Sequence, residues 1–247
     1  MARWWQTLKA LWAGGGIGRI LMDSAVASHV VLSGRILDAG GRGEHSSHGL
    51  LDTSAAGSFN VLDIAADDTV DIVGSVTHLP FGSGCHDVVL CLNVLEHVLD
   101  YTSAVHELCR ILRPGGRLYG RVPFLMHVHA DPSDYWRYTK SSLEHVLREA
   151  GFEEIVVEAD GGLFLVILNL LDPILRRSGP LKYIVSPALL ALDGIFAKAI
   201  GASASRERYP LGYFFVAKTR ANGSNTREHD QEGDFGSAQA VSGPGNG

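Results

Sequence analysis

The stretch His86–Val94, HDVVLCLNV, is apolar almost throughout and lacks the alternation of a half-buried strand. A strand of this kind has to be covered on both faces, as parallel strands inside α/β sheets are. Similar short apolar runs recur along the chain, mostly with helical segments between them: RILDA, FNVLDI, VDIVGSV, GRLYGRVPF, EEIVVEA and LGYFFVAKT. This alternation predicts an α/β fold with a doubly wound, mostly parallel sheet.

We expect three parts in the chain. Residues 1–32 form N-terminal helices that cap the domain. Residues 33–220 form the α/β domain, which carries a helical apolar insert at about 162–208. Residues 221–247 consist mainly of glycine, serine, asparagine and acids, and we expect this tail to be disordered.

One helix of the domain has a recognisable start. Either Thr139 or Ser141 begins it, and Ser141 and Glu144 have the spacing of a capping box. Gly151 ends the helix, and the run EEIVVEA follows as a strand.

The composition limits the partners and the compartment. The net charge of −6 argues against a nucleic-acid partner, because phosphate backbones require clustered lysine and arginine. The three cysteines, Cys85, Cys91 and Cys109, include no CxxC pair, and two of them lie in apolar stretches. Free thiols of this kind suit a reducing compartment, so we expect a cytoplasmic protein. No segment reaches about 18 uninterrupted apolar residues, so no membrane-spanning helix is expected.

The N-terminus is an amphipathic segment. Residues 1–12 space tryptophans and leucines helically, with Arg3 and Lys9 between them. We interpret this segment as a packing helix; the alternative is an interfacial membrane helix with tryptophans at the headgroup level.

The insert is too apolar for a solvent-exposed loop. Three prolines interrupt it: Pro173, Pro180 and Pro187. We therefore expect two or three short helices. The insert forms an extra core layer, a contact in a homodimer, or a lid over a substrate pocket. A lid with Arg176, Arg177 and Lys182 would also dock on a membrane surface and would favour a hydrophobic or lipid-linked substrate.

A glycine turn follows the first strand of the predicted sheet. Asp38 ends the apolar run, and Gly40, Gly41 and Gly43 come next. In an open α/β sheet, ligands bind at the carboxyl ends of the strands near the switch in strand order. Asp63 ends the second strand, where a carboxylate suits two hydrogen bonds to a ribose diol. The pattern predicts a nucleoside-type cofactor at this edge.

A dinucleotide does not fit this loop well. The dinucleotide fingerprint is GxGxxG at the start of a helix, but Ser46 stands where the third glycine would be. Glu44 would also lie unfavourably beside a diphosphate. A cofactor without phosphate fits better, and a nicotinamide-dependent oxidoreductase is disfavoured.

Five segments occur in an order and spacing that are specific together: ILDAGGRG, VLDI, VGSVTHLPF, HDVVLCLNVLEHV and ELCRILRPGGRLYGRVPF. With them, the chain resembles class I S-adenosylmethionine-dependent methyltransferases of the type-eleven group over roughly residues 32–158. The segment DPSDYWRYT, residues 131–139, resembles the DPxDYWRYT signature of a bacterial subgroup. The resemblance implies a Rossmann-like sheet of seven strands with the last strand antiparallel, and S-adenosylmethionine as cofactor.

The resemblance also assigns the cofactor contacts. The glycines would face the methionine moiety and the ribose, and Asp63 would hold the ribose hydroxyls. Ile64 would pack on adenine, Ser75 and Val76 would lie near it, and Asn93 would lie near the methionyl amino group. The expected cofactor-binding residues are Asp38, Gly40, Gly41, Gly43, Asp63, Ile64, Ser75, Val76 and Asn93.

The sequence departs from the family pattern at two positions. Arg42 replaces a glycine of the usual DxGxGxG loop, and Ser75 replaces an acid that would bind the adenine amino group by a charge-assisted hydrogen bond. An arginine fits if its φ is ordinary and its side chain points to solvent or to the carboxylate of the cofactor. We expect binding with the Arg42 guanidinium turned aside; the alternative is a loop that no longer binds cofactor.

Candidates for substrate contact follow the fifth strand, where loops carry function. They are His127, His129, Asp131, Tyr135 and Arg137. A His or Asp would serve as base, Arg137 would bind an anionic group, and the aromatic rings would stack on the substrate. The alternative is that these side chains order the loop, with Arg137 paired to Asp131 or Asp134.

Methyl transfer by in-line displacement depends mainly on alignment, which supplies about 7–11 kcal/mol in well-oriented reactions. The predicted function is therefore methyl transfer to a small-molecule acceptor or to a lipid- or glycan-linked one. The alternative is a catalytically impaired binding or scaffolding protein on the same fold. No metal site is expected, because His45 and His48, like His127 and His129, lack a clear third ligand.

Overall fold

The computed structural model describes residues 2–43 and 51–221. Its elements, in chain order, are α1 (Ala2–Trp12), α2 (Ile17–His29), β1 (Gly34–Ala39), β2 (Ala56–Asp63), β3 (Ile72–Val73), β4 (His86–Leu92), η3 (Leu95–His97), α3 (Tyr101–Ile111), β5 (Leu112–Pro123), α4 (Lys140–Glu149), β6 (Phe152–Gly161), α5 (Leu163–Arg177), η4 (Gly179–Leu181), α6 (Lys182–Ile200), α7 (Ala202–Arg208) and β7 (Pro210–Thr219). The strands form a seven-stranded sheet in the order β3-β2-β1-β4-β5-β7-β6, and β7 runs antiparallel to its neighbours. The predicted α/β fold with a mostly parallel sheet and an antiparallel last strand is confirmed.

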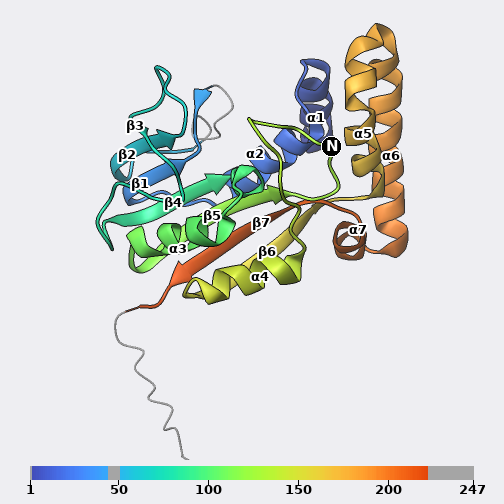
Figure 1. Cartoon of the computed structure of the whole chain (residues 1–247). Helices are drawn as coiled ribbons and strands as arrows, with labels where there is room; N and C mark the ends of the chain where they lie inside the picture. The colour runs from blue at the N-terminus through green and yellow to red at the C-terminus, as the bar shows by residue number, and fades with distance from the viewer. Residues whose placement is uncertain (1, 44–50, 222–247) are drawn as a thin grey trace, which may run out of the picture.

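Strand β4 shows why its sequence does not alternate. Val89 and Cys91 belong to the core cluster on the side of α3 and α4, whereas Val88 and Leu90 belong to the cluster that includes Met22 of α2. Helices α2 and α3 lie on opposite sides of the sheet (Figure 1). Both faces of β4 are therefore buried against helices, as the apolar run requires.

The strand order reverses between β1 and β4. From β1 the chain continues to β2 and β3 in one direction, and from β4 it continues to β5 in the other. Residues 36–38 of β1 pair in parallel with residues 88–90 of β4. The carboxyl ends of these two strands consequently border the crevice in which α/β sheets bind ligands.

Helix α4 begins at the first of its two candidate starts. Thr139 is the N-cap, and its Oγ1 accepts a hydrogen bond of 3.2 Å from the Ser142 amide. The capping box of Ser141 and Glu144 is not formed, because Ser141 already lies inside the helix.

The insert forms longer helices than the sequence predicted. Pro173 lies inside the 15-residue helix α5, and Pro187 lies inside the 19-residue helix α6, so the expected breaks at these two prolines are wrong. Only Pro180 lies in the turn between the helices, in η4. Leu168 and Leu175, on either side of Pro173, are both buried in one cluster with α1, α2 and β7 residues. This packing keeps the two halves of α5 in one helix.

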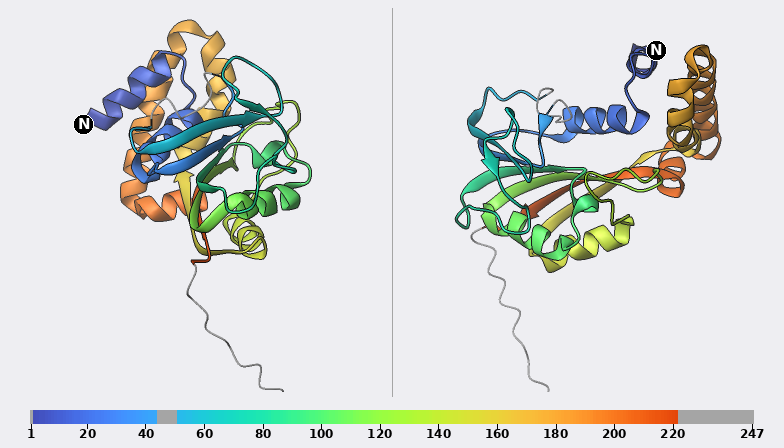
Figure 2. Two further views of the ribbon diagram at one scale, coloured as in Figure 1. Left: turned by 90° about the vertical axis from the view of Figure 1, so that its left-hand side faces the viewer. Right: turned by 45° about the horizontal axis from the view of Figure 1, so that its top comes forward.

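Helices α5 and α6 lie side by side and stand at one edge of the sheet, next to α1 (Figures 1 and 2). By length and composition, the segment Gly179–Ile200 is long and apolar enough to cross a membrane, and only 11% of its most apolar window is buried. The sequence led us to expect no membrane-spanning helix, and this segment corrects that expectation as far as length and composition are concerned.

Candidate functional site

A cavity of about 600 Å³ lies at the carboxyl ends of β1, β2 and β4. Six of the residues predicted for the site line it: Gly40, Gly43, Asp63, Asn93, His129 and Asp131. Residues that the sequence reasoning did not assign also line it, among them Gly18, Arg19, Met22, Leu92, His97 and Arg121. The volume lies within the range of about 300–1,000 Å³ usual for small-ligand sites.

The glycine turn is required partly by the contacts of the protein itself. Gly40 has a φ of +87°, and a Cβ at this position would lie 2.3 Å from Val94 Cγ2. A Cβ at Gly41 would lie 2.3 Å from the Asp38 carboxylate. Neither Asp38, which is buried, nor Gly41 lines the cavity. These two residues therefore shape the turn, while Gly40 and Gly43 form part of the cavity wall.

Arg42 lies at the cavity and is not turned aside as expected. Its Nε is 3.7 Å from Asp63 Oδ1, and its Nη2 is 3.5 Å from Asp131 Oδ1. Among the residues that the structure describes, Asn93 is the only non-glycine with a positive φ, so the backbone of Arg42 is ordinary. The guanidinium thus connects two carboxylates from opposite sides of the crevice.

The residues assigned to the adenosine half are only partly brought together. Asp63 ends β2 at the cavity, and its Oδ1 accepts a hydrogen bond of 2.9 Å from the Ala65 amide. Ile64, the next residue, is 71% exposed and does not line the cavity. Ser75 and Val76 do not line the cavity: the Ser75 hydroxyl pairs with that of Thr77 at 2.8 Å, and Val76 is buried in the core.

Asn93 is fixed from two sides. Arg121 Nη1 donates to the Oδ1 of Asn93 at 3.0 Å, and the Nδ2 of Asn93 faces Met22 Sδ at 3.3 Å. Its φ of 56° is in the left-handed region, which is uncommon away from glycine and is often found at functional sites. Arg121 itself is 1% exposed and forms a two-point ion pair with Asp160, with distances of 2.8 and 3.1 Å. Arg121 stands in the middle of the apolar run GRLYGRVPF, and this unusual position was the signal in the sequence that could have identified it as a site residue.

The segment 131–139 is held by contacts within the protein. Arg137 pairs with both carboxylate oxygens of Asp134, at 2.5 and 2.7 Å, and this guanidinium holds the pKa of Asp134 well below its usual range although burial opposes it. Trp136 Nε1 donates to the Val98 carbonyl at 3.0 Å, and the Tyr138 hydroxyl donates to the Leu95 carbonyl at 3.1 Å. Arg137 therefore has the loop-ordering role that was its alternative interpretation.

Two other candidates that follow β5, Tyr135 and His127, do not reach the cavity. Tyr135 is 48% exposed, and its amide donates to the Glu96 carbonyl at 2.8 Å. His127 is exposed, and its carbonyl lies 3.2 Å from His129 Nδ1. Of the candidates for substrate contact, the structure brings only His129 and Asp131 to the cavity wall.

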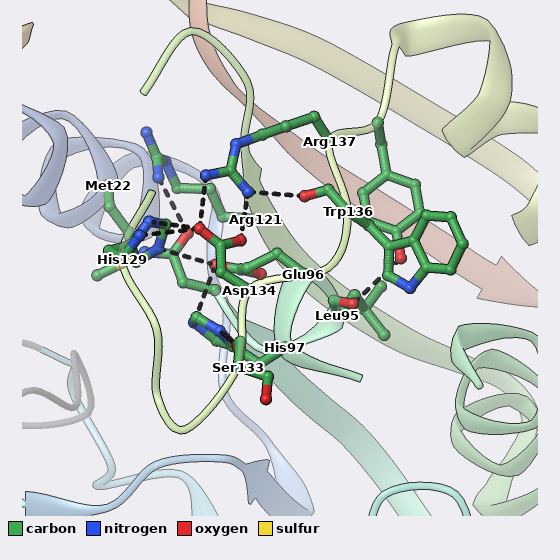
Figure 3. Close-up of polar contacts among 12 residues, drawn as sticks. Met22, Leu95, Glu96, His97, Arg121, His129, Ser133, Asp134, Trp136 and Arg137 are labelled. Carbon is green, nitrogen blue, oxygen red and sulfur yellow. Dashed lines mark hydrogen bonds and ion pairs between the residues drawn. The ribbon is translucent and has the colours of Figure 1, made fainter. Parts of the chain in front are cut away.

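A buried carboxylate meets two imidazoles of this wall (Figure 3). Glu96 Oε1 is 3.7 Å from His97 Nε2 and 3.7 Å from His129 Nε2. The Glu96 carboxylate is the main cause that raises the pKa of His129, while burial opposes this shift. Glu96 was not singled out from the sequence, because in NVLEHV it precedes a predicted helix and its partner His129 is far along the chain.

Comparisons with known proteins agree with this fold. Residues 52–120 match the family described as Methyltransferase domain. The demethylmenaquinone methyltransferase of Mycolicibacterium vanbaalenii is 41% identical over 54 residues, which are 22% of this chain and 24% of that protein. The chain therefore spans about a quarter of the length of this curated relative.

Two solved structures share the architecture. The alignment with the [4+2]-cyclase SpnF covers 81% of this chain and 80% of the cyclase chain, with a TM-score of 0.53 and 18% identity. The second structure is phosphoethanolamine N-methyltransferase 2 of Haemonchus contortus in complex with S-adenosyl-L-methionine. The alignment with it covers 84% of this chain and 53% of that chain, with a TM-score of 0.52 and 17% identity. These structural likenesses show that the chain shares the fold of the two proteins, and the family match covers residues 52–120 of that fold.

Proposed function

We propose that this protein transfers a methyl group from S-adenosylmethionine to an acceptor bound in the same cavity. The observation that carries the proposal is the cavity at the strand-order switch, where Asp63 ends β2 beside the glycine turn. The cofactor supplies an activated methyl group on a sulfonium, and the protein has to align the acceptor with it. The DPSDYWRYT segment supports assignment to the subgroup with that signature.

The residues at the cavity fit this cofactor. Asp63 offers carboxylate oxygens to a ribose diol. Ile64 follows it with an exposed apolar side chain that does not line the cavity but would be available to adenine. Gly40 and Gly43 leave the backbone open to the ligand. Asn93 and Arg121 would lie toward the methionine end.

We further propose that the acceptor is lipid- or glycan-linked and is presented at a membrane surface. The demethylmenaquinone and phosphoethanolamine methyltransferases differ in the acceptors that their names state, so they do not select one for this chain. The hairpin of α5 and α6 is the supporting feature. Its large exposed apolar side chains are Leu170, Ile174, Leu181, Tyr183, Ile184, Leu192, Ile195 and Ile200.

The end of the hairpin combines aromatic rings and cations, as interfacial helices do. Trp12 of α1 packs against Tyr183 with ring centroids 5.3 Å apart, and Lys182 Nζ lies 5.1 Å from the centre of the Tyr183 ring. Arg176 and Arg177 are exposed at the end of α5. We expect a cytoplasmic protein that associates with the membrane peripherally through this end.

A binding or scaffolding role is the second candidate function. It is favoured by one observation, the Arg42 guanidinium beside Asp63, because a ribose diol would have to share this carboxylate with a cation. The same fold in a [4+2]-cyclase indicates that fold alone does not fix the chemistry.

The two functions are distinguished by calorimetric titration with S-adenosylhomocysteine. We expect the wild-type protein to bind it, and Asp63→Ala to weaken binding at least about tenfold, since hydrogen bonds to a charged group contribute about 1.5–3 kcal/mol. Asp68→Ala is the matched control, because Asp68 is an exposed acid of the same loop that does not line the cavity. The absence of binding at millimolar ligand would contradict the methyltransferase proposal and favour the scaffold.

A further inference from the structure

Glu96 is a buried acid whose carboxylate has no hydrogen-bond donor. Its side chain is 0% exposed, and neither oxygen has a hydrogen-bond partner in the part of the chain that the structure describes. Burying a carboxylate without a compensating cation or donor costs several kcal/mol. The contacts at 3.7 Å to the two imidazole nitrogens are too long for hydrogen bonds. The position of Glu96 therefore suits a further positive group placed between the carboxylate and the two imidazoles.

The two imidazoles are turned toward the same point as the carboxylate. One ligand atom from each of Glu96, His97 and His129 lies within 4.8 Å of the other two. The His97 and His129 rings are 5.2 Å apart at an interplanar angle of 83°. Bonds of about 2.0–2.2 Å to a tetrahedral metal place its ligands roughly 3.4 Å apart. The two Glu96–imidazole distances of 3.7 Å thus need only a few tenths of an ångström of contraction.

The other nitrogen of each ring has a partner that fixes the ring. His97 Nδ1 lies 2.6 Å from the Ser133 carbonyl (Figure 3). His129 Nδ1 lies 3.2 Å from the His127 carbonyl and 3.4 Å from Asp134 Oδ2. Because these acceptors require a proton on Nδ1, the lone pair of each neutral imidazole is on Nε2, facing Glu96. Carbonyl and carboxylate partners of this kind orient histidine ligands at metal sites.

The segment 131–139 builds this outer layer. Ser133 and Asp134 hold the two histidines, and Arg137 in turn holds Asp134. The amides of Tyr135 and Trp136 donate to the Glu96 carbonyl at 2.8 and 3.2 Å. Residues that do not reach the cavity thus position Glu96 and the two histidines that face it.

We propose that Glu96, His97 and His129 bind a first-row divalent cation of the Zn²⁺ class. Two imidazoles and one carboxylate suit zinc, iron or cobalt, whereas magnesium and calcium prefer oxygen ligands. His97 and His129 line the cavity, so a cation held by them would lie at the edge of the space in which an acceptor would bind.

The consequence for catalysis rests on the proposed methyltransferase function. A hydroxyl acceptor that binds the cation loses its proton to solvent more readily, because the cation stabilises the resulting oxyanion. This oxygen then forms a bond to the methyl carbon while the carbon–sulfur bond breaks and its electron pair returns to sulfur. The cation would thus select an acceptor that offers oxygen.

The site is tested with Co²⁺ alone, without cofactor or acceptor, because the visible absorption of Co²⁺ reports its coordination. We expect the untagged full chain to bind one Co²⁺ with the absorption of a low-coordinate site, and excess Zn²⁺ to abolish the signal. His97→Ala, His129→Ala and Glu96→Gln should each weaken Co²⁺ binding at least tenfold. Glu96→Gln keeps the shape of the side chain, so thermal unfolding without metal checks that this variant is folded.

Two controls exclude histidines elsewhere. His106 is exposed on α3, and His45 and His48 lie outside the described residues. His106→Ala and the double variant His45→Ala/His48→Ala should bind Co²⁺ as the wild type does. The proposal is overturned if no Co²⁺ absorption develops, or if the absorption survives all three changes at the site. Neither result affects the titration with S-adenosylhomocysteine, so the two proposals fail separately.

Discussion

Arg42 is the residue at which this chain departs most from the pattern of the family that it resembles, and its contacts predict a measurable effect. Its guanidinium lies 3.7 Å from Asp63 Oδ1, and its side chain is 37% exposed. An exposed ion pair of this kind contributes about 0.2–1 kcal/mol, which a diol that binds Asp63 has to replace. We therefore expect Arg42→Ala to tighten binding of S-adenosylhomocysteine by about 1.5–5-fold in calorimetric titration.

Arg19→Ala is a suitable control for this experiment, because Arg19 also lines the cavity but pairs with Asp23 on its own helix, at 2.8 Å. The affinity of Arg19→Ala for S-adenosylhomocysteine should not exceed that of the wild type. Weaker binding by Arg42→Ala would show that the guanidinium contacts the ligand directly, and would contradict the interpretation that it competes for Asp63.

At the scale of single residues, the sequence could indicate only those groups that end a strand or interrupt one. Asp63 was identified because it ends an apolar run, and the structure places it at the cavity. Met22 could not be identified, because nothing in the sequence of α2 states which strand end it approaches. Glu96 and His129 are joined only by the fold of the segment 131–139, which no local pattern predicts.

Among the elements, the strands were predicted well because their pattern has one physical cause. A parallel strand with two covered faces has to be apolar at every position, and β4 shows such a run. The helices of the insert were predicted less well. A proline removes one backbone hydrogen bond and strains the preceding turn, but the buried contacts of Leu168 and Leu175 hold α5 across Pro173. Local propensity could not account for this tertiary packing.

Two acids that join elements predict how stability depends on pH. Burial raises the pKa of Asp87. The Arg35 amide, at 2.7 Å, and the Arg113 guanidinium lower this pKa by more, so the net shift is to below 3.8. The Arg110 guanidinium, at 2.6 Å, is the main cause that lowers the pKa of Glu107 below 4.5. Acids whose pKa is lower in the folded state stabilise it above the unfolded-state value, and this contribution is lost as the pH falls through the folded-state value.

We therefore expect the double variant Asp87→Asn/Glu107→Gln to lose about 1 kcal/mol of unfolding free energy per site at pH 7. The difference from wild type should shrink as the pH falls below the unfolded-state values of about 4, because the unfolded chain then takes up protons more readily than the folded state does. Urea unfolding followed by circular dichroism at the two pH values measures this. Glu149→Gln, on the exposed side of α4, is the control and should change stability little. An equal loss at both pH values would show that the effect is steric.

The whole molecule is asymmetric, because its apolar hairpin stands at one edge of the sheet while β3 forms the opposite edge (Figure 2). Ile184 and Ile195 of α6 are 69% and 64% exposed, which leaves a large apolar face without cover in the described chain. A lipid surface would cover this face, and the cations at the end of α5 favour anionic headgroups. The same face would also be covered by a second copy of the chain.

Flotation with vesicles that contain phosphatidylglycerol distinguishes a lipid surface from a second copy of the chain as the cover of this apolar face. We expect the wild type to float, and Ile184→Glu/Ile195→Glu to bind vesicles at least about tenfold more weakly, since one buried isoleucine contributes about 1.5–3 kcal/mol. Val73→Glu changes an apolar side chain of similar exposure, 59%, at the opposite edge and should float as the wild type does. If the wild type does not float, and light scattering shows a dimer that the α6 variant dissociates, the hairpin is a subunit contact and the membrane proposal is wrong.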